Sequence, residues 1–209
     1  ARVAPRGEAR QQLGLAAEAT VVALAPGSRA QEVKALLPRF LEAAALVAAR
    51  HPACRFILPL AGEELRPIVE TEVERRGMAV QIELGRAPEV FRACDLLLVA
   101  SGTATLEAAL LGAPMVIAYV VRPSTYWLAR RFVKVQDIGL VNLIAGKRIV
   151  PEHVQGECTP ENLAASILRL FPGTAAADEQ RAALAAVAAQ LGDPGASQRA
   201  AQALIDFLP

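Results

Sequence analysis

Aromatic residues are scarce in this sequence, where Phe, Trp and Tyr together make up 4% of the 209 residues. Hydrophobic residues nevertheless account for 54% of the chain, so its core must be built mainly from Ala, Leu and Val. Small and branched aliphatic side chains let helices pack closely on a sheet, which favours a layered α/β domain over a β-sandwich. The same hydrophobic content argues against disorder.

An excess of charge of either sign is also missing, because 22 Lys and Arg residues stand against 21 Asp and Glu residues. Nucleic-acid-binding domains usually carry a clear basic excess, so no nucleic-acid partner is expected. No apolar run approaches the roughly 20 residues that are needed to cross a bilayer. The polar, charged stretch 1–14 is unlike a signal peptide. We therefore expect a cytoplasmic protein.

Closely spaced metal or redox ligands are absent as well. Cys54, Cys94 and Cys158 lie far apart and form no CxxC pair, so we predict buried free thiols and neither a disulfide nor a metal site. His51 and His153 have no obvious carboxylate partner in the sequence and are predicted to be solvated or to cap helices. The lack of GxGxxG after a strand argues against a dinucleotide dehydrogenase, and the lack of GxxxxGK[ST] excludes a Walker-type nucleotidase.

Short apolar segments alternate with longer segments of helical periodicity. The predicted strands span residues 20–25, 55–59, 80–84, 96–100 and 114–119, and the predicted helices between them span 31–50, 63–76, 88–93 and the stretch from the 101–103 turn to 111. This alternation predicts a Rossmann-like parallel sheet with helices on both faces and right-handed crossovers.

The pattern changes after residue 121. Residues 124–135 are predicted to be helical and 136–150 irregular, and further helices are predicted over 160–170, 176–191 and 196–208. We divide the chain into a Rossmann-like nucleotide-binding domain over residues 1–175 and carboxyl-terminal helices over 176–209. These helices are expected to pack on that domain or on a partner.

The first predicted strand ends in a turn whose composition suits an anion. In open parallel sheets, ligands bind beyond the carboxyl ends of the strands. Gly27 allows backbone amides to approach a phosphate closely, Ser28 is suited to cap the following helix, and Arg29 offers a fork of donors that matches phosphate oxygens. A plain capping turn explains the Gly and the Ser as well, but it leaves Arg29 without a role.

The fourth predicted strand ends in a second such turn, Ser101-Gly102-Thr103. Small residues at a helix start expose unpaired amides at the positive end of the helix dipole. Glu107 lies one turn further on, where a carboxylate would repel phosphates, so we expect it to bind neutral hydroxyls such as a ribose diol. A solvated Glu on a structural helix is the alternative for this residue.

One turn is too weak a site for a nucleotide. A helix dipole contributes about 0.3–1 kcal/mol, whereas micromolar affinity requires roughly 8 kcal/mol. We therefore expect the corners at Gly27 and Gly102 to converge, so that their amides and the Arg29 guanidinium together bind a pyrophosphate.

Several segments, taken together, resemble lipid-A-disaccharide synthase, a GT-B glycosyltransferase family of lipopolysaccharide biosynthesis. These segments are residues 25–29, 100–107, 114–119, 133–135, 142–147 and 149–152. The resemblance runs in order over nearly the whole chain and begins where the carboxyl-terminal half of the family begins. Ala25 replaces the Leu that usually precedes Pro-Gly-Ser-Arg, and Val141 replaces a common Pro. Neither change removes a polar ligand group.

The resemblance implies the carboxyl-terminal, UDP-binding domain of a GT-B enzyme. The family transfers 2,3-diacylglucosamine from UDP to diacylglucosamine 1-phosphate, a lipid monosaccharide phosphate, and inverts the anomeric centre. Arg29 and the Ser101–Thr103 turn would hold the diphosphate, and Glu107 would hold the ribose. The resemblance implies neither a metal nor another cofactor, because Arg29 and helix amides would stabilise the charge that develops on the leaving UDP.

Two further implications concern assembly. The amino-terminal half, with most of the acceptor site and a proposed catalytic carboxylate, is missing from the resemblance, so the chain alone is expected to be inactive. Asn142 would lie near the phosphates, presented across a homodimer if carboxyl-terminal segments are exchanged, as members of this family can do. A loop or cap residue is the alternative for Asn142. A lipid substrate also implies a peripheral position on the inner membrane.

Residues 123–134 combine the one Trp with Tyr, Phe and three cations, as an interfacial helix does. Contact with a membrane or an acyl chain and burial between domains both remain open for this segment. Two other functions also remain open for the chain. A UDP-sugar 2-epimerase shares the GT-B plan, but we find no strong acid/base candidate, and a non-catalytic nucleotide-binding module is the second alternative.

Overall fold

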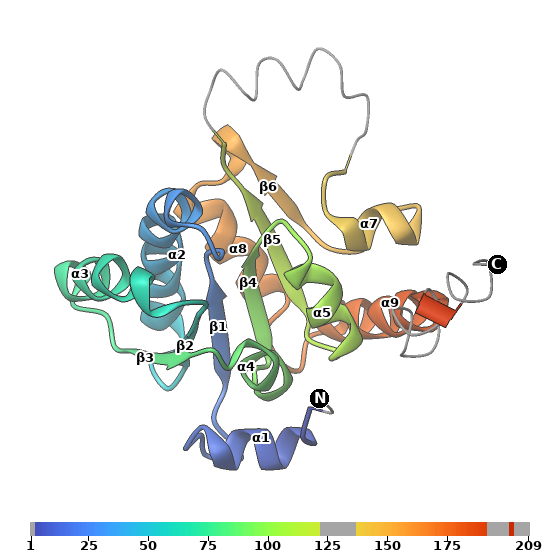
Figure 1. Cartoon of the computed structure of the whole chain (residues 1–209), viewed down its shortest axis with the longest axis horizontal. Coiled ribbons are helices and arrows are strands. Elements are labelled where there is room, and N and C mark those ends of the chain that lie inside the picture. The colour runs from blue at the N-terminus through green and yellow to red at the C-terminus, as the bar shows by residue number, and fades with distance from the viewer. Residues whose placement is uncertain (1–2, 122–136, 192–200, 203–209) are drawn as a thin grey trace.

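The computed structural model describes residues 3–121, 137–191 and 201–202. In these parts, six parallel strands form one sheet in the order β3-β2-β1-β4-β5-β6 (Figure 1). The strands are β1 (Val21–Ala25), β2 (Arg55–Leu60), β3 (Val80–Leu84), β4 (Leu96–Ala100), β5 (Met115–Tyr119) and β6 (Glu152–Val154). The α helices are α1 (Arg6–Gln12), α2 (Ala30–Arg50), α3 (Arg66–Arg76), α4 (Ala87–Ala93), α5 (Ala104–Leu110), α7 (Leu140–Ala145), α8 (Pro160–Arg169) and α9 (Ala175–Leu191), and the 3-10 helices are η1 (Glu63–Leu65) and η2 (Gln155–Glu157).

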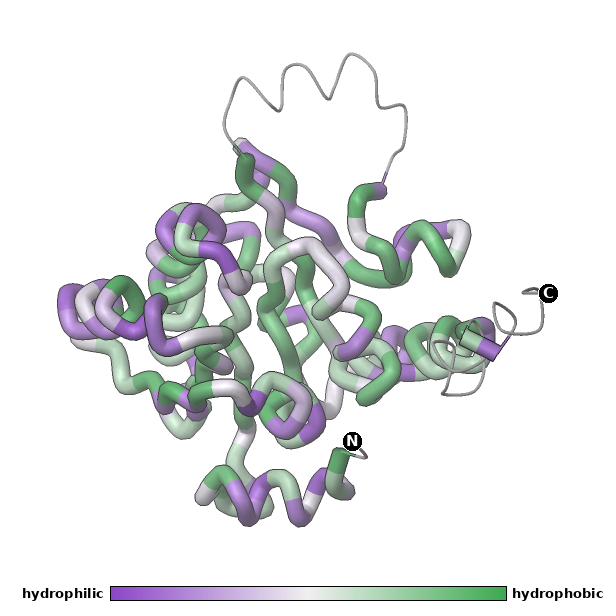
Figure 2. The backbone as a smooth tube through the Cα atoms, viewed as in Figure 1, coloured by the Kyte–Doolittle hydropathy of each residue, from purple (hydrophilic) through white to green (hydrophobic). Residues whose placement is uncertain are grey.

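The sheet is covered on both faces, as the alternation in the sequence predicts. Successive strand residues point to opposite faces, and each set joins a separate hydrophobic cluster. On one face α2, α3 and α8 pack over strand residues such as Leu24 and Leu98. On the other face α1, α4, α5, α7 and α9 pack over residues such as Ala23 and Val99. Figure 2 shows the apolar colouring along the central strands and the hydrophilic colouring on α3.

All five predicted strands are present, and the predicted Rossmann-like parallel sheet is confirmed. β4 is buried along its entire length, which agrees with the prediction of a central strand that is apolar on both sides. The three thiols are free and buried, as predicted. Burial raises the pKa of Cys54 to about 11 and that of Cys94 to about 12, so both thiols stay protonated at neutral pH.

The prediction that residues 136–150 are irregular was wrong in part, because α7 forms within them. This helix is short, and side chains rather than its own periodicity fix its position. Glu152, at the start of β6, accepts hydrogen bonds from the amides of Ile138 and Gly139 (both 2.9 Å). A buried carboxylate thus holds the chain at the point where it enters α7.

Helix α9 packs on the sheet domain through Gln180, which is 4% exposed. Its Oε1 accepts a hydrogen bond from the Met115 amide (2.7 Å), and its Nε2 donates to the Met115 and Ile149 carbonyls (3.2 and 3.3 Å). These hydrogen bonds join α9 to β5 and to the segment before β6. The boundary at residue 175 stays a prediction.

The aromatic and cationic segment 123–134 lies outside the described residues, and so does most of the helix predicted over 196–208. Within the described parts, no helix combines the length and apolarity that a membrane span needs.

His51 follows the end of α2, where its ring stacks on Phe171 with 4.0 Å between the ring centroids. His153 Nε2 lies 2.8 Å from the Ser166 hydroxyl, and burial lowers the pKa of this histidine.

Candidate functional site

The two predicted turns lie side by side at the carboxyl edge of the sheet. β1 and β4 are adjacent parallel strands, with Ala25 in register with Val99. The strand order reverses between them, because β2 and β3 lie on the outer side of β1 and β5 and β6 on the outer side of β4. In open α/β sheets such a reversal opens a crevice beyond the strand ends, where ligands bind. The predicted convergence of the corners at Gly27 and Gly102 is therefore present in the fold.

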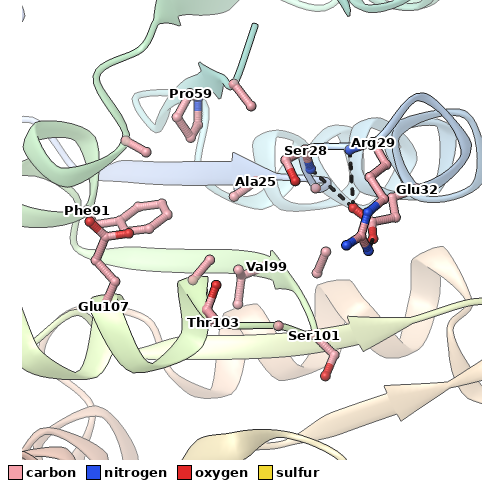
Figure 3. Close-up of a pocket in the computed structure, with 16 residues that line it drawn as sticks. Ala25, Ser28, Arg29, Glu32, Pro59, Phe91, Val99, Ser101, Thr103 and Glu107 are labelled. Carbon is pink, nitrogen blue, oxygen red and sulfur yellow. Dashed lines mark hydrogen bonds and ion pairs between the residues drawn. The ribbon is translucent and has the colours of Figure 1, made fainter. Parts of the chain in front are cut away.

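A pocket of about 360 Å³ fills this crevice (Figure 3). The first corner contributes Gly27, Ser28 and Arg29, the second contributes Ser101, Gly102 and Thr103, and Glu107 lies further along α5. Apolar residues complete the wall, among them Pro59, Ala61, Ala87 and Phe91. The pocket thus combines polar groups from two corners with apolar residues and one aromatic ring. A nucleotide presents a matching combination in its phosphates, its ribose and its flat base.

The first corner contains a residue that the sequence analysis overlooked. Glu32 Oε2 accepts hydrogen bonds from the amides of Ser28 (3.1 Å) and Arg29 (3.3 Å), and its Oε1 accepts from Arg29 Nη1 at 3.0 Å. Figure 3 shows these contacts at the start of α2. The Ser28 side chain was predicted to cap this helix, and that prediction was wrong, because the N-cap residue is Arg29 and the capping carboxylate is Glu32. A Glu three residues after the N-cap is a recognised capping signal.

Among the described residues, no side chain caps the second corner. Thr103 is the N-cap residue of α5 and its side chain makes no cap hydrogen bond. The Ser101 amide is bound to the Ala118 carbonyl of the neighbouring strand (2.9 Å). Within the described chain, no hydrogen bond occupies the amides of Gly102 and Thr103. These amides therefore remain available to an acceptor in the pocket.

Glu107 contributes the negative charge on the α5 side of the pocket. Desolvation, and then the neighbouring carboxylate of Glu89, raises the pKa of Glu107. Its surroundings thus already disfavour negative charge, and a phosphate beside it would add to the repulsion. The binding of neutral hydroxyls by Glu107 stays a prediction.

Asn142 does not line the pocket, unlike the other predicted residues. Its side chain is 1% exposed, and its Nδ2 donates to the Val150 carbonyl (2.8 Å) and to Glu152 Oε1 (2.6 Å). Its Oδ1 accepts from the amides of Ile149 (2.8 Å) and Val150 (2.9 Å). These contacts use the full hydrogen-bonding capacity of the amide. They favour the structural alternative, and contact with phosphates stays a prediction without support from this geometry.

A second pocket, of about 680 Å³, adjoins the first on the β5 side. The two pockets share Arg29, Glu32, Ala100 and Ser101, and the second continues toward Lys34 and along the residues after β5. The Arg29–Glu32 pair therefore stands at the junction of the two.

Among the described residues there is no group of three or more His, Cys, Asp or Glu side chains that could hold a metal ion.

The family model of lipid-A-disaccharide synthetase matches residues 2–207. The lipid-A-disaccharide synthase of Myxococcus xanthus (strain DK1622) is 42% identical over 200 residues, which cover 96% of this chain and 52% of that protein. The enzyme of the same name from Geobacter metallireducens is 40% identical over 210 residues, covering 99% of this chain and 55% of that protein. The chain thus spans about half the length of these curated relatives.

Solved structures share the fold at low sequence identity. The UDP-GlcNAc 2-epimerase from Neisseria meningitidis, solved with UDP-GlcNAc, superposes with a TM-score of 0.64 at 16% identity, over 96% of this chain and 48% of that one. The carboxyl-terminal CMP-Kdo binding domain of WaaA from Acinetobacter baumannii superposes with a TM-score of 0.55 at 15% identity, over 87% of this chain and 95% of that domain. The fold is therefore one that GT-B glycosyltransferases and related epimerases share.

Proposed function

Because the chain belongs to the lipid-A-disaccharide synthetase family, we propose that it is the donor-binding half of an inverting glycosyltransferase that makes the lipid A disaccharide. The donor in this proposal is UDP-2,3-diacylglucosamine and the acceptor is diacylglucosamine 1-phosphate. A second domain supplies most of the acceptor site and the catalytic base. The lipid substrates place the reaction at the inner membrane, where the protein acts peripherally.

The observation that carries the proposal is the pocket at the strand reversal, where polar groups of two separate corners meet an apolar wall. In the proposed complex the diphosphate lies between Arg29 and the amides of Gly102 and Thr103, which have no partner in the part of the chain that the structure describes. The ribose lies beside Glu107 and the uracil lies along the wall that contains Phe91. These positions follow the chemistry of the pocket, since each part of UDP meets a group of complementary character.

Arg29 is the residue to which we assign stabilisation of the leaving group. Breaking the bond between sugar and phosphate increases the negative charge on the UDP oxygens, and preorganised donors lower the energy of that transition state. A guanidinium presents several donors in a fixed fork and keeps its charge. Together with the α5 amides it supplies the positive potential that a divalent cation provides in other transferases, so we propose that the reaction needs no metal.

Isothermal titration calorimetry of this chain with UDP tests the proposal. We expect Arg29→Ala to weaken UDP binding about 10- to 100-fold, since hydrogen bonds to charged groups contribute about 1.5–3 kcal/mol. Uridine has no phosphates, so its binding should not respond to this change. Glu107→Ala should weaken UDP and uridine alike. Arg50→Ala, on the exposed last turn of α2, is the control that should change neither.

UDP affinity that survives both Arg29→Ala and Glu107→Ala would contradict the assigned site. The chain alone should show no transfer, because the proposal places the acceptor site and the base in a second domain. Epimerised product from UDP-GlcNAc would instead identify a sugar-nucleotide epimerase. Transfer that is unchanged by EDTA in the two-domain enzyme is the result that agrees with metal-free catalysis.

A further inference from the structure

Glu32 lies between the backbone and the guanidinium of the first corner. One of its oxygens accepts the Ser28 and Arg29 amides, at 3.1 and 3.3 Å, and the other accepts Arg29 Nη1 at 3.0 Å. Within the described chain, Glu32 is the one side chain that binds the Arg29 guanidinium, so Nε and Nη2 of Arg29 have no protein partner. The Arg29 side chain is 80% exposed, whereas that of Glu32 is 31% exposed. The Glu32 carboxylate is therefore fixed by the backbone of the corner, and the Arg29 guanidinium is exposed toward the solvent.

Gly27 creates the space for this arrangement. Its backbone has φ +118°, a conformation that L side chains rarely adopt. A Cβ at this position would lie 2.7 Å from the Cβ of Glu32 and closer still to its carboxylate. The glycine thus serves the placement of Glu32 as well as any approach of a ligand. The backbone conformation at Gly27 and the position of the Glu32 carboxylate therefore depend on each other.

The Arg29–Glu32 pair also lies where the two adjoining pockets meet. Arg29 and Glu32 line both the nucleotide pocket and the larger pocket on the β5 side. A UDP-sugar that extends across this border places its sugar–phosphate bond near the pair. The free donors of Arg29 then lie where charge develops when that bond breaks.

We propose that Glu32 is a positioning residue, which holds Arg29 at the junction of the two pockets so that the remaining guanidinium donors meet the phosphate next to the bond that breaks. The inference rests on the proposed function. It also divides the work between the corners. Because Glu32 occupies the amides of Ser28 and Arg29, the backbone donors for the diphosphate come from the corner at Gly102, and the first corner contributes the guanidinium.

A double-mutant cycle separates this role from two simpler ones. UDP and uridine binding is measured by calorimetry for the chain itself and for Arg29→Ala, Glu32→Gln and the double variant. Glu32→Gln can still accept the amide hydrogen bonds, but it loses the ion pair. We expect it to weaken UDP binding about two- to fivefold, the range for one exposed ion pair. It should not change uridine binding, and it should have no further effect once Arg29 is Ala.

Other results would overturn the proposal. Tighter UDP binding by Glu32→Gln in both backgrounds would identify Glu32 as a competitor that occupies the phosphate position. Equal UDP affinity with a lower melting temperature would leave it a purely structural cap. Asp178→Asn, which removes an exposed i,i+3 pair with Arg181 on α9, is the matched control and should leave UDP binding unchanged.

Glu32→Asp is the second variant, in case Glu32→Gln does not fold. It keeps the charge but shortens the reach by one methylene, so positioning predicts a loss of UDP affinity, and unchanged affinity would refute it. The wild-type titration distinguishes the two levels of inference. Failure of the wild type to bind UDP refutes the proposed function itself. Wild-type binding that is insensitive to both Glu32 variants refutes the positioning role alone.

Discussion

Replacing Asn142 with Ala tests whether this residue holds the fold or a ligand. The change removes four hydrogen bonds in a site that is 1% exposed. The amides of Ile149 and Val150 lose their acceptor, and Glu152 loses one of its donors. A buried polar group without a partner costs about 1–3 kcal/mol, and entry of water recovers part of this. We therefore expect a loss of about 2–4 kcal/mol in the free energy of unfolding.

Chemical denaturation and thermal melting measure this loss. For a chain of this length, 1 kcal/mol corresponds to roughly 2–4 °C, so the melting temperature should fall by about 5–15 °C. Asn162→Ala is the matched control, because the Asn162 side chain is exposed and donates one hydrogen bond to the Glu157 carbonyl. Its effect should stay within about 0.5 kcal/mol. UDP affinity, measured below the melting transition, should not change in either variant.

The reasoning would be refuted if Asn142→Ala kept its stability and lost UDP affinity by an order of magnitude. That outcome would restore the prediction, made from the resemblance, that Asn142 lies near the phosphates. The same titration on a dimeric two-domain enzyme would then establish whether the residue acts across subunits.

Three further predictions concern the backbone, the core and pH. Gly27→Ala should lower the free energy of unfolding by about 1–3 kcal/mol because of the positive φ of this residue and the contact that a Cβ would make with Glu32. Gly7→Ala, in an open helical position, is the control and should not destabilise the chain. Urea denaturation compares the two variants. Gln180→Ala should destabilise the chain by about 1–3 kcal/mol, because the Met115 amide and carbonyl both lose a partner. Burial raises the pKa of Cys94 from its ordinary value of 9.0 to about 12. Above pH 9.0 the thiol of the unfolded chain therefore loses a proton that the folded thiol keeps. The free energy of unfolding should fall as the pH rises through this range. Cys94→Ala should flatten that alkaline loss in pH-dependent denaturation, and an unchanged slope would contradict the assignment.

The central part of the sheet is predictable from sequence because local and global preferences agree there. β4 is five apolar residues and is buried on both faces, and the helix over 31–50 has its apolar residues on the face that packs in the structure. Since parallel strands end at one edge, Gly27 and Gly102 were expected at the same edge of the sheet, and the pairing of β1 with β4 in the structure brings them together. The outer part of the sheet behaves differently. β6 has three residues and includes Glu152 and His153, so no apolar periodicity marks it.

The contacts that sequence reasoning missed join side chains to the backbone of segments far away in the sequence. Glu152 fixes the entry to α7 from a position 13 residues away, and Gln180 reaches β5 across 65 residues. Local patterns contain no signal for such contacts, because the partner is chosen by the tertiary fold. Glu32 is close in sequence to the groups that it binds, but with Ser28 as the predicted cap the third following residue is Gln31. The structure places the N-cap one residue later, at Arg29, and this brings Glu32 to the capping position.

Glu32 also changes how the two corners should be compared. Both place a glycine and small polar residues at a helix start, and the sequence predicts that the amides of both corners bind the diphosphate. At the first corner the protein's own carboxylate occupies the amides, whereas at the second corner the amides of Gly102 and Thr103 have no partner within the described chain. A diphosphate between them would therefore receive backbone donors from the α5 side and, from the α2 side, a guanidinium that Glu32 holds in position. That asymmetry suits a leaving group, because the α5 amides bind the diphosphate while the positioned guanidinium faces the oxygen on which the charge grows.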